Sequence, residues 1–277
     1  MKYRHSFHAG NFADVHKHVA LLALLSTLKR KEKGFAYFET HAGRGAYDLS
    51  HASAEAQEGT GRFTVGEYVA DELRRYAAWV SDFRSTRNSR AYPGSPLLAA
   101  RELRPQDRAL LCEIIPAEAR MLERELGRNS TVRVERGDGF ERLRAWLPPV
   151  ERRGLIFIDP PYEQSRQDFE RVTASIADAL QRFSTGIFAA WYPIKDEREI
   201  RAWHGRFGRA VRHETLASEM WLYPRDSQVA LNGSGLLIVN PPYLLAERMQ
   251  VWLPELQSQL EAGHGGGTSV TKLPRAT

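Results

Sequence analysis

Cysteine is almost absent from this chain: Cys112 is the only one among 277 residues. A single cysteine can form neither an internal disulfide framework nor a multi-cysteine zinc or iron–sulfur site. It ends the apolar run 109–112, so we expect an inert core side chain rather than a reactive thiol.

Long apolar runs are also missing. A membrane helix needs roughly 18 apolar residues, whereas the longest candidate, 19–28, is interrupted by Ser26 and Thr27. The N-terminus lacks the apolar core of a signal peptide. We therefore expect a cytoplasmic protein without membrane contact and, since no coiled-coil or repeat pattern occurs, a monomer.

The usual nucleotide fingerprints do not occur either. Residues 39–45, Glu-Thr-His-Ala-Gly-Arg-Gly, depart from the dinucleotide spacing Gly-x-Gly-x-x-Gly, and no Gly-Lys-Ser/Thr is present. Gly43 and Gly45 would let the backbone approach a ligand closely. A tight turn between a strand and a helix explains the same residues equally well.

The positive charge is concentrated near the N-terminus. The chain has a formal net charge of +5, and residues 1–34 hold seven Lys and Arg against Asp14 and Glu32, again +5. A second basic run contains Arg84, Arg87 and Arg90. Such clusters indicate a surface that faces a polyanion, although an ordinary solvated face is an equal alternative.

Apolar patterning predicts an α/β fold with a doubly wound parallel sheet. The expected strands are 35–39, 108–113, 131–135, 155–159 and 186–191, with helices between them and a final antiparallel pair, 211–216 and 235–240. Residues 46–95 show helical patterning and no strand, which predicts an inserted helical subdomain. The main domain is then 1–45 and 96–260, with a flexible Gly-rich tail at 261–277.

The sequence Ile158-Asp159-Pro160-Pro161-Tyr162 follows the fourth expected strand. Open α/β sheets bind ligands at the carboxyl ends of their strands. The Asp159 carboxylate and the Pro160 carbonyl can accept hydrogen bonds from an exocyclic amine, and Tyr162 can stack on the ring. This arrangement is typical of methyltransferases that act on an adenine amine, with Asp159, Pro160 and Tyr162 as catalytic residues.

A second motif, Asn240-Pro241-Pro242-Tyr243, is an equally legitimate amine-binding sequence. Strand order decides between the two. Glu113 ends the second strand, where it can accept bonds from ribose hydroxyls, and Asp138-Gly139 follows the third, where it can face an adenine amine. This succession matches the order of sites in an S-adenosylmethionine-binding fold, and its fourth position belongs to Asp159.

Four of the nine histidines, His5, His8, His16 and His18, lie in the first 18 residues. His16 and His18 point in different directions on a helix and no cysteine joins them, so we expect no metal site. The aromatic, basic and polar residues of segment 1–13 suit an arm that contacts RNA bases and phosphates; a polar N-terminal cap is the plainer alternative.

The whole pattern resembles the bacterial RlmJ family, Rossmann-like class I 23S rRNA adenine-N6 methyltransferases with a small helical subdomain inserted after the first strand. The resemblance covers residues 1 to about 260. It is carried by 3–11, Asp14-Val15, Lys17-His18, 40–43, Tyr92-Pro93-Gly94-Ser95-Pro96, 153–156, 158–162 and Trp191-Tyr192-Pro193.

This resemblance implies S-adenosylmethionine as the methyl donor and 23S rRNA, naked or in an assembly particle, as the substrate. The cofactor-binding residues that it implies are His18, His41, Ser95, Glu113, Asp138 and Gly139, to which the glycine turn adds Gly43. It implies an RNA contact at Tyr3, to which we add His5 and Lys17 of the basic N-terminal region. The residues alone leave three alternatives open: methylation of DNA adenine, methylation of protein glutamine, and RNA binding without catalysis.

Overall fold

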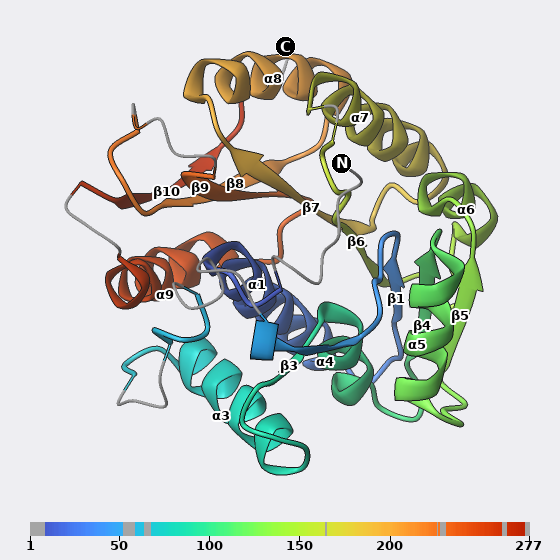
Figure 1. Ribbon diagram of the computed structural model, residues 1–277. Coiled ribbons are helices and arrows are strands. Elements are labelled where there is room, and N and C mark those ends of the chain that lie inside the picture. The colour runs from blue at the N-terminus through green and yellow to red at the C-terminus, as the bar shows by residue number, and fades with distance from the viewer. Residues whose placement is uncertain are drawn as a thin grey trace.

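The computed structural model describes residues 9–51, 59–63, 68–163, 165–225, 227, 231–261 and 265–274. Its centre is an eight-stranded sheet with the order β10-β8-β9-β7-β6-β1-β4-β5 (Figure 1). The strands are β1 (Ala36–Glu39), β4 (Arg108–Glu113), β5 (Val132–Arg136), β6 (Gly154–Ile158), β7 (Ile187–Ile194), β8 (Thr215–Trp221), β9 (Gly233–Val239) and β10 (Gly267–Lys272).

The first five strands of this sheet in chain order, β1, β4, β5, β6 and β7, run parallel to one another. Strand β9 is antiparallel to both β7 and β8. The expected parallel sheet with a final antiparallel pair is therefore confirmed, although the first strand of that pair covers 215–221 and not 211–216. Strand β6, which leads to Asp159, is the fourth strand. The architecture is that of a Rossmann-like, doubly wound α/β sheet.

Helices cover both faces of the sheet. Helices α1 (Phe12–Lys29), α4 (Ser95–Glu102) and α9 (Leu245–Leu260) lie on one face, and α6 (Gly139–Trp146), α7 (Ser165–Arg182) and α8 (Glu197–Ala210) on the other (Figure 1). Helix α5 (Pro116–Leu126) packs against β4 and β5. No helix of the described part of the chain is long and apolar enough to span a membrane.

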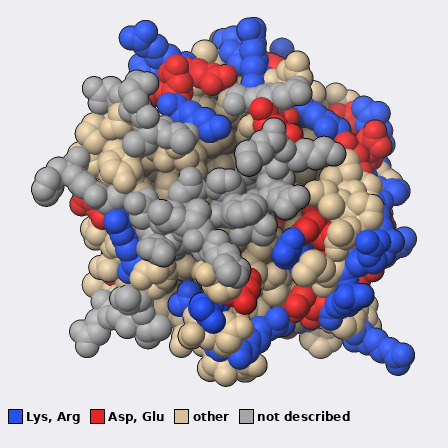
Figure 2. Space-filling model, viewed as in Figure 1, with Lys and Arg blue, Asp and Glu red and all other residues tan. Residues whose placement is uncertain are grey.

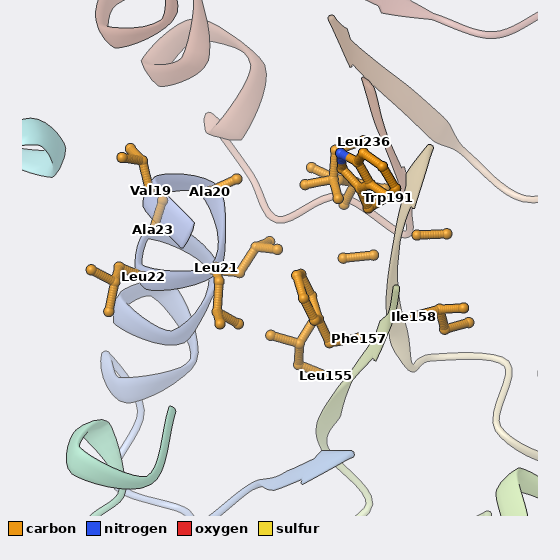
Figure 3. Packing of buried hydrophobic residues seen from close by; sticks show 14 of the residues in the cluster. Val19, Ala20, Leu21, Leu22, Ala23, Leu155, Phe157, Ile158, Trp191 and Leu236 are labelled. Atoms are coloured by element: carbon orange, nitrogen blue, oxygen red, sulfur yellow. The ribbon is translucent and has the colours of Figure 1, made fainter. Parts of the chain in front are cut away.

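Helix α1 is buried along almost its whole length, from Phe12 to Leu25. Figure 3 shows its leucines and alanines between the sheet and the surrounding helices, with Phe157 and Trp191 on the side of the sheet that faces α1. Because no side of this part of α1 faces water, its polar residues need partners inside the protein.

The expected absence of strands in 46–95 is wrong. Strands β2 (Ala46–Asp48) and β3 (Ala91–Pro93) form a separate antiparallel pair that closes the base of the insertion around α3 (Asp71–Ser85); a 3-10 turn, η2 (Leu49–His51), follows β2. Strands of three residues are too short to show alternation, so the pattern could not reveal them. Helices α4 and α9 were likewise not predicted.

The expected flexible tail also needs correction, because β10 lies inside it. Its six residues pair antiparallel with β8, from Gly267 opposite Trp221 to Lys272 opposite Leu216. The outer edge of β8 offers unpaired backbone groups, and Thr268, Val270 and Thr271 are β-branched residues that favour a strand. The glycine-rich sequence therefore marks the connection that leads into β10, and not a flexible tail over the whole of 261–277.

Cys112 is an inert core residue, as predicted. It is fully buried, its thiol donates to the carbonyl oxygen of Gly137 at 3.2 Å, and burial raises its pKa to about 11.

Candidate active site

The carboxyl ends of β1, β4 and β6 bring the predicted site residues to one edge of the sheet. Glu39, the last residue of β1, is in register with Leu111 of β4 and Phe157 of β6. Glu113, the last residue of β4, and His41 and Asp159, which follow β1 and β6, therefore share one edge, as expected for ligand-binding residues of an open α/β sheet.

Asp159 is paired with a buried lysine. Its Oδ2 lies 2.5 Å from Nζ of Lys17, which also lies 2.8 Å from Oδ1 of Asp14. The side chains of Lys17 and Asp159 are 4% and 11% exposed. Lys17 Nζ also lies 5.2 Å from the centre of the Trp191 ring, a cation–π contact. The Asp159 carboxylate is thus held on one side by a buried cation.

The prediction that Lys17 contacts RNA is therefore corrected. Lys17 points into the protein because the part of α1 that carries it is buried on all sides, and its charge is compensated there by two carboxylates. Asp14 is itself fixed by the backbone N–H of Gly10, which donates to Oδ2 at 2.8 Å. The role that fits this arrangement is orientation of Asp159.

Glu39, which was not predicted as a separate site residue, lies beneath this pair. It is fully buried and accepts hydrogen bonds from the hydroxyls of Tyr37 at 2.9 Å and Ser95 at 2.5 Å. Burial raises its pKa to about 8, which the two hydrogen bonds only partly offset. Ser95, expected at the cofactor, thus also anchors the start of α4 to the end of β1.

The Glu39→Gln variant is expected to change the pH dependence of stability. The folded protein binds a proton at Glu39 up to about pH 8, whereas the unfolded chain releases it near 4.5. Unfolding free energy should therefore fall as pH rises between these values, by on the order of 1 kcal/mol per pH unit. Urea unfolding at pH 5, 6.5 and 8 should show a shallower fall for Glu39→Gln; parallel slopes would contradict the assignment.

The glycine turn after β1 is fastened to the end of β4. The backbone N–H of Gly43 donates to Oε2 of Glu113 at 2.8 Å, and that of Ile115 donates to Oε1 at 2.7 Å. Gly43 has φ +63°, and a Cβ there would lie 2.5 Å from the Tyr47 hydroxyl. Burial raises the pKa of Glu113, which the two backbone bonds oppose.

Asp138 and Gly139 form the N-terminus of α6. Asp138 Oδ1 caps the helix by accepting from Phe140 N at 2.9 Å, and Oδ2 pairs with Arg171. Burial disfavours its charged form, but Arg171 and the cap bonds hold its pKa below the usual value. A Cβ on Gly139 would lie 2.0 Å from the Thr40 carbonyl oxygen, so only glycine lets α6 approach the turn after β1 this closely.

The two histidines predicted at the cofactor occupy different surroundings. His41 is half-buried, with Nδ1 2.8 Å from the Thr40 hydroxyl and its ring edge-on to Phe140; burial lowers its pKa to about 4. His18 is buried and stacks on Tyr92, whose hydroxyl lies 2.8 Å from Nδ1. His41 thus lies in the turn after β1, close to Gly43. His18 is part of α1, and its ring packs against Tyr92 of β3.

Tyr162 is held more firmly than the stacking prediction assumed. Its ring is 3% exposed and packs against Phe169 and Trp191, and its hydroxyl donates to the Trp191 carbonyl oxygen at 2.6 Å. Its φ is +48°. In this arrangement Tyr162 fixes the loop that carries Asp159. Its ring could stack on a base only if one of its faces, now covered by Phe169 or Trp191, became exposed.

The second motif, 240–243, lies at the opposite edge of the sheet from Asp159. Because β9 is antiparallel to β7, with Val239 opposite Phe188, Asn240 lies near the start of the parallel strands. Its amide donates to the carbonyls of Ser184 and Gly186, both at 2.8 Å, and Tyr243 is 85% exposed. The choice of Asp159 over Asn240 is therefore supported by the topology.

Tyr3 and His5, the predicted RNA contacts, lie outside the described residues. The two basic runs are partly neutralised where they are described: Lys29 pairs with Glu102 at 2.8 Å and Arg87 with Glu125 at 2.5 Å. Figure 2 shows Lys and Arg around the margin of one face, several of them beside Asp or Glu. Within the described part of the chain no group of His, Cys, Asp and Glu could hold a metal ion.

Comparison with known proteins agrees with this geometry. Residues 32–272 match the model of the family described as "Ribosomal RNA large subunit methyltransferase D, RlmJ". The chain is 42% identical over 97% of both chains to the ribosomal RNA large subunit methyltransferase J of Escherichia coli K12, and 39% identical over 94% of both to that of Haemophilus influenzae. The crystal structure of protein LPL1258 from Legionella pneumophila is similar over 95% of this chain and 98% of that one, with 37% identity and a TM-score of 0.85.

Proposed function

The chain belongs to the RlmJ family of large-subunit ribosomal RNA methyltransferases, and from this we propose that it methylates the exocyclic N6 amine of one adenine in 23S rRNA, with S-adenosylmethionine as donor. The observation that carries the proposal is the placement of Asp159. It directly follows the fourth strand, at the edge proposed to bind ligands, beside Pro160 and in contact with Lys17.

The chemical task of the protein is to make a poor nucleophile reactive. The N6 lone pair of adenine is delocalised into the ring, and hydrogen bonds from N6–H to the Asp159 carboxylate and the Pro160 carbonyl would localise and orient it. A carboxylate offers about four acceptor positions, so the bond from Lys17 to Oδ2 leaves room for the amine. Asp159 can take the proton afterwards. Positioning and electrostatics supply most of the acceleration.

The edge formed by β1, β4 and β5 has a composition that suits S-adenosylmethionine, which supplies an electrophilic methyl group when bound. Glu113 is an acid held rigidly at the end of β4, and the neighbouring Ile114 is an apolar side chain that is 59% exposed. A nucleoside fits this edge, because the acid can accept hydrogen bonds from the ribose hydroxyls and the exposed apolar side chain can pack against the base. We assign the cofactor to His41, Gly43, Glu113, Asp138 and Gly139, with His18 and Ser95 behind them.

The substrate RNA would approach from the same edge, and the adenine must leave its stack to reach Asp159. Tyr3 and His5 remain our proposed RNA contacts. Residues 9–13 of the expected arm are buried, and Phe12 and Ala13 belong to α1, so this part of the prediction is wrong. The relatives act on large-subunit ribosomal RNA by name, so DNA adenine, protein glutamine and binding without catalysis are not favoured. We also propose a cytoplasmic location, because ribosomal RNA is the proposed substrate. We further propose that it acts as a monomer, on naked rRNA or on an assembly particle.

The test is methyl transfer from labelled S-adenosylmethionine to unmodified 23S rRNA, followed by nucleoside analysis of the product. We expect one N6-methyladenosine per rRNA molecule. Duplex DNA, a protein with a glutamine acceptor and a large-subunit precursor particle are the alternative substrates. Transfer to DNA or protein but not to either form of rRNA would contradict the proposed function.

A further inference from the structure

Trp191, in β7, contacts both residues that determine the position of Asp159. Lys17 Nζ lies over its ring at 5.2 Å from the centre, and its carbonyl oxygen accepts the hydrogen bond from Tyr162 at 2.6 Å. The rings of Tyr162 and Trp191 also meet edge to face, 5.7 Å apart. A change in the rotamer of Trp191 would therefore remove the cation–π contact with Lys17 and the ring contact with Tyr162, while the bond from the Tyr162 hydroxyl to the backbone carbonyl would remain.

The indole of Trp191 is fixed by a short chain of buried hydrogen bonds. Its Nε1–H donates to the hydroxyl of Ser234 in β9 at 3.0 Å. The same hydroxyl lies 2.9 Å from Nδ1 of His16, and Nε2 of His16 lies 3.1 Å from the hydroxyl of Ser218 in β8. His16, Ser218 and Ser234 are all completely buried, so no solvent competes for these bonds.

His16 is suited to this place because it stays uncharged. Burial lowers its pKa to about 3, and a neutral imidazole has one donor and one acceptor nitrogen. Serine hydroxyls can donate or accept, so either tautomer can bond both serines. His16 directly precedes Lys17, and its bonds to β8 and β9 therefore also fix the part of α1 that carries the lysine.

We propose that Ser234, held by His16, is a positioning residue for methyl transfer: it locks the Trp191 indole, and through it Lys17 and the Asp159 loop. This inference rests on the proposed function. The plain alternative is that the two serines and His16 only stabilise the packing of α1 on the sheet. Ser218 distinguishes the positioning role from the packing role. It bonds the same histidine as Ser234, but through the other ring nitrogen, Nε2, on the side away from Trp191.

The experiment compares Ser234→Ala with its matched control, Ser218→Ala, in the full-length protein. Each removes one buried hydroxyl that bonds His16, so both should lower Tm; Ser234→Ala should lower it more, because it also removes the acceptor of the Trp191 indole N–H. Only Ser234→Ala should reduce the single-turnover methyl-transfer rate at saturating cofactor and rRNA, by roughly tenfold, a loss of about 1.4 kcal/mol of transition-state stabilisation. The Kd for S-adenosylmethionine should stay within about twofold in both.

A second readout follows Trp191 directly. In protein labelled with 5-fluorotryptophan, the ¹⁹F resonance of Trp191, assigned by its loss in Trp191→Phe, should shift or broaden in Ser234→Ala and stay unchanged in Ser218→Ala. Ser234→Thr, which keeps the hydroxyl, should restore both the resonance and the rate.

Two results would overturn the inference: a Ser234→Ala rate within twofold of wild type, or equal rate losses in both serine variants with the Trp191 resonance unchanged. A wild-type protein that methylates no substrate would instead count against the proposed function, and the fluorine measurement would still decide whether Ser234 fixes Trp191.

Discussion

Asp159→Ala is expected to reduce methyl transfer by about a thousandfold, which is the usual cost of removing a group that stabilises the transition state directly. The substitution removes the carboxylate that would accept the N6–H bond and leaves only the Pro160 carbonyl to orient the amine. The measurement is the single-turnover rate with 23S rRNA, with the Kd for S-adenosylmethionine determined separately by calorimetry. Cofactor affinity should be nearly unchanged, because the residues assigned to direct cofactor contact lie at or just after the ends of β1, β4 and β5 and not in the loop after β6.

The chain offers its own control in Asn240→Ala. This variant removes the corresponding polar residue of the second motif, whose amide only joins β9 to the carbonyls of Ser184 and Gly186. It should lose some stability and keep its rate. If Asp159→Ala retained activity within a few-fold of wild type while Asn240→Ala lost it, the catalytic assignment would have to move to the other edge of the sheet.

The parallel sheet and its ligand-binding edge could be predicted because the strands are apolar runs. Residues 155–158 are buried on both faces of the sheet, and such a run identifies a central strand without any knowledge of its neighbours. Counting these strands was enough to choose Asp159 over Asn240. The sequence predicted 235–240 as one strand of an antiparallel pair, but not which strand of that pair runs against the parallel strands. That β9 runs antiparallel to β7, and so puts Asn240 at the opposite edge, is the physical reason the choice holds.

The partners of Asp159 could not be predicted, because they depend on packing between distant segments. Lys17 belongs to a basic stretch and therefore indicated contact with RNA; only the complete burial of its part of α1 shows that it points inward. Glu39 was read as part of a glycine turn, yet Tyr37, two residues earlier on the same face of β1, and Ser95 turn it into a buried acid. Strand β10 forms only because β8 offers it an edge.

Lys17→Met is expected to be the most destabilising single change at the site. Asp14 and Asp159 would both lose a buried cation, and removing one partner of a buried ion pair leaves charge in a poorly solvated place, at a cost of roughly 3 kcal/mol. For a chain of this size that corresponds to a fall in Tm of about 6–10 °C. Methyl transfer should fall as well, since Asp159 would no longer be held toward the amine.

The matched control for this variant is Lys29→Met, on the same helix. Lys29 also pairs with a glutamate, at 2.8 Å, but its side chain is 30% exposed, so water replaces much of the lost interaction and the cost should stay below about 1 kcal/mol. Calorimetric unfolding of both variants, together with their methyl-transfer rates, tests whether burial sets the difference. Equal shifts in Tm would mean that the Lys17–Asp159 pair is no stronger than a surface pair, and the orientation of Asp159 would then have to depend on Tyr162 and Trp191 alone.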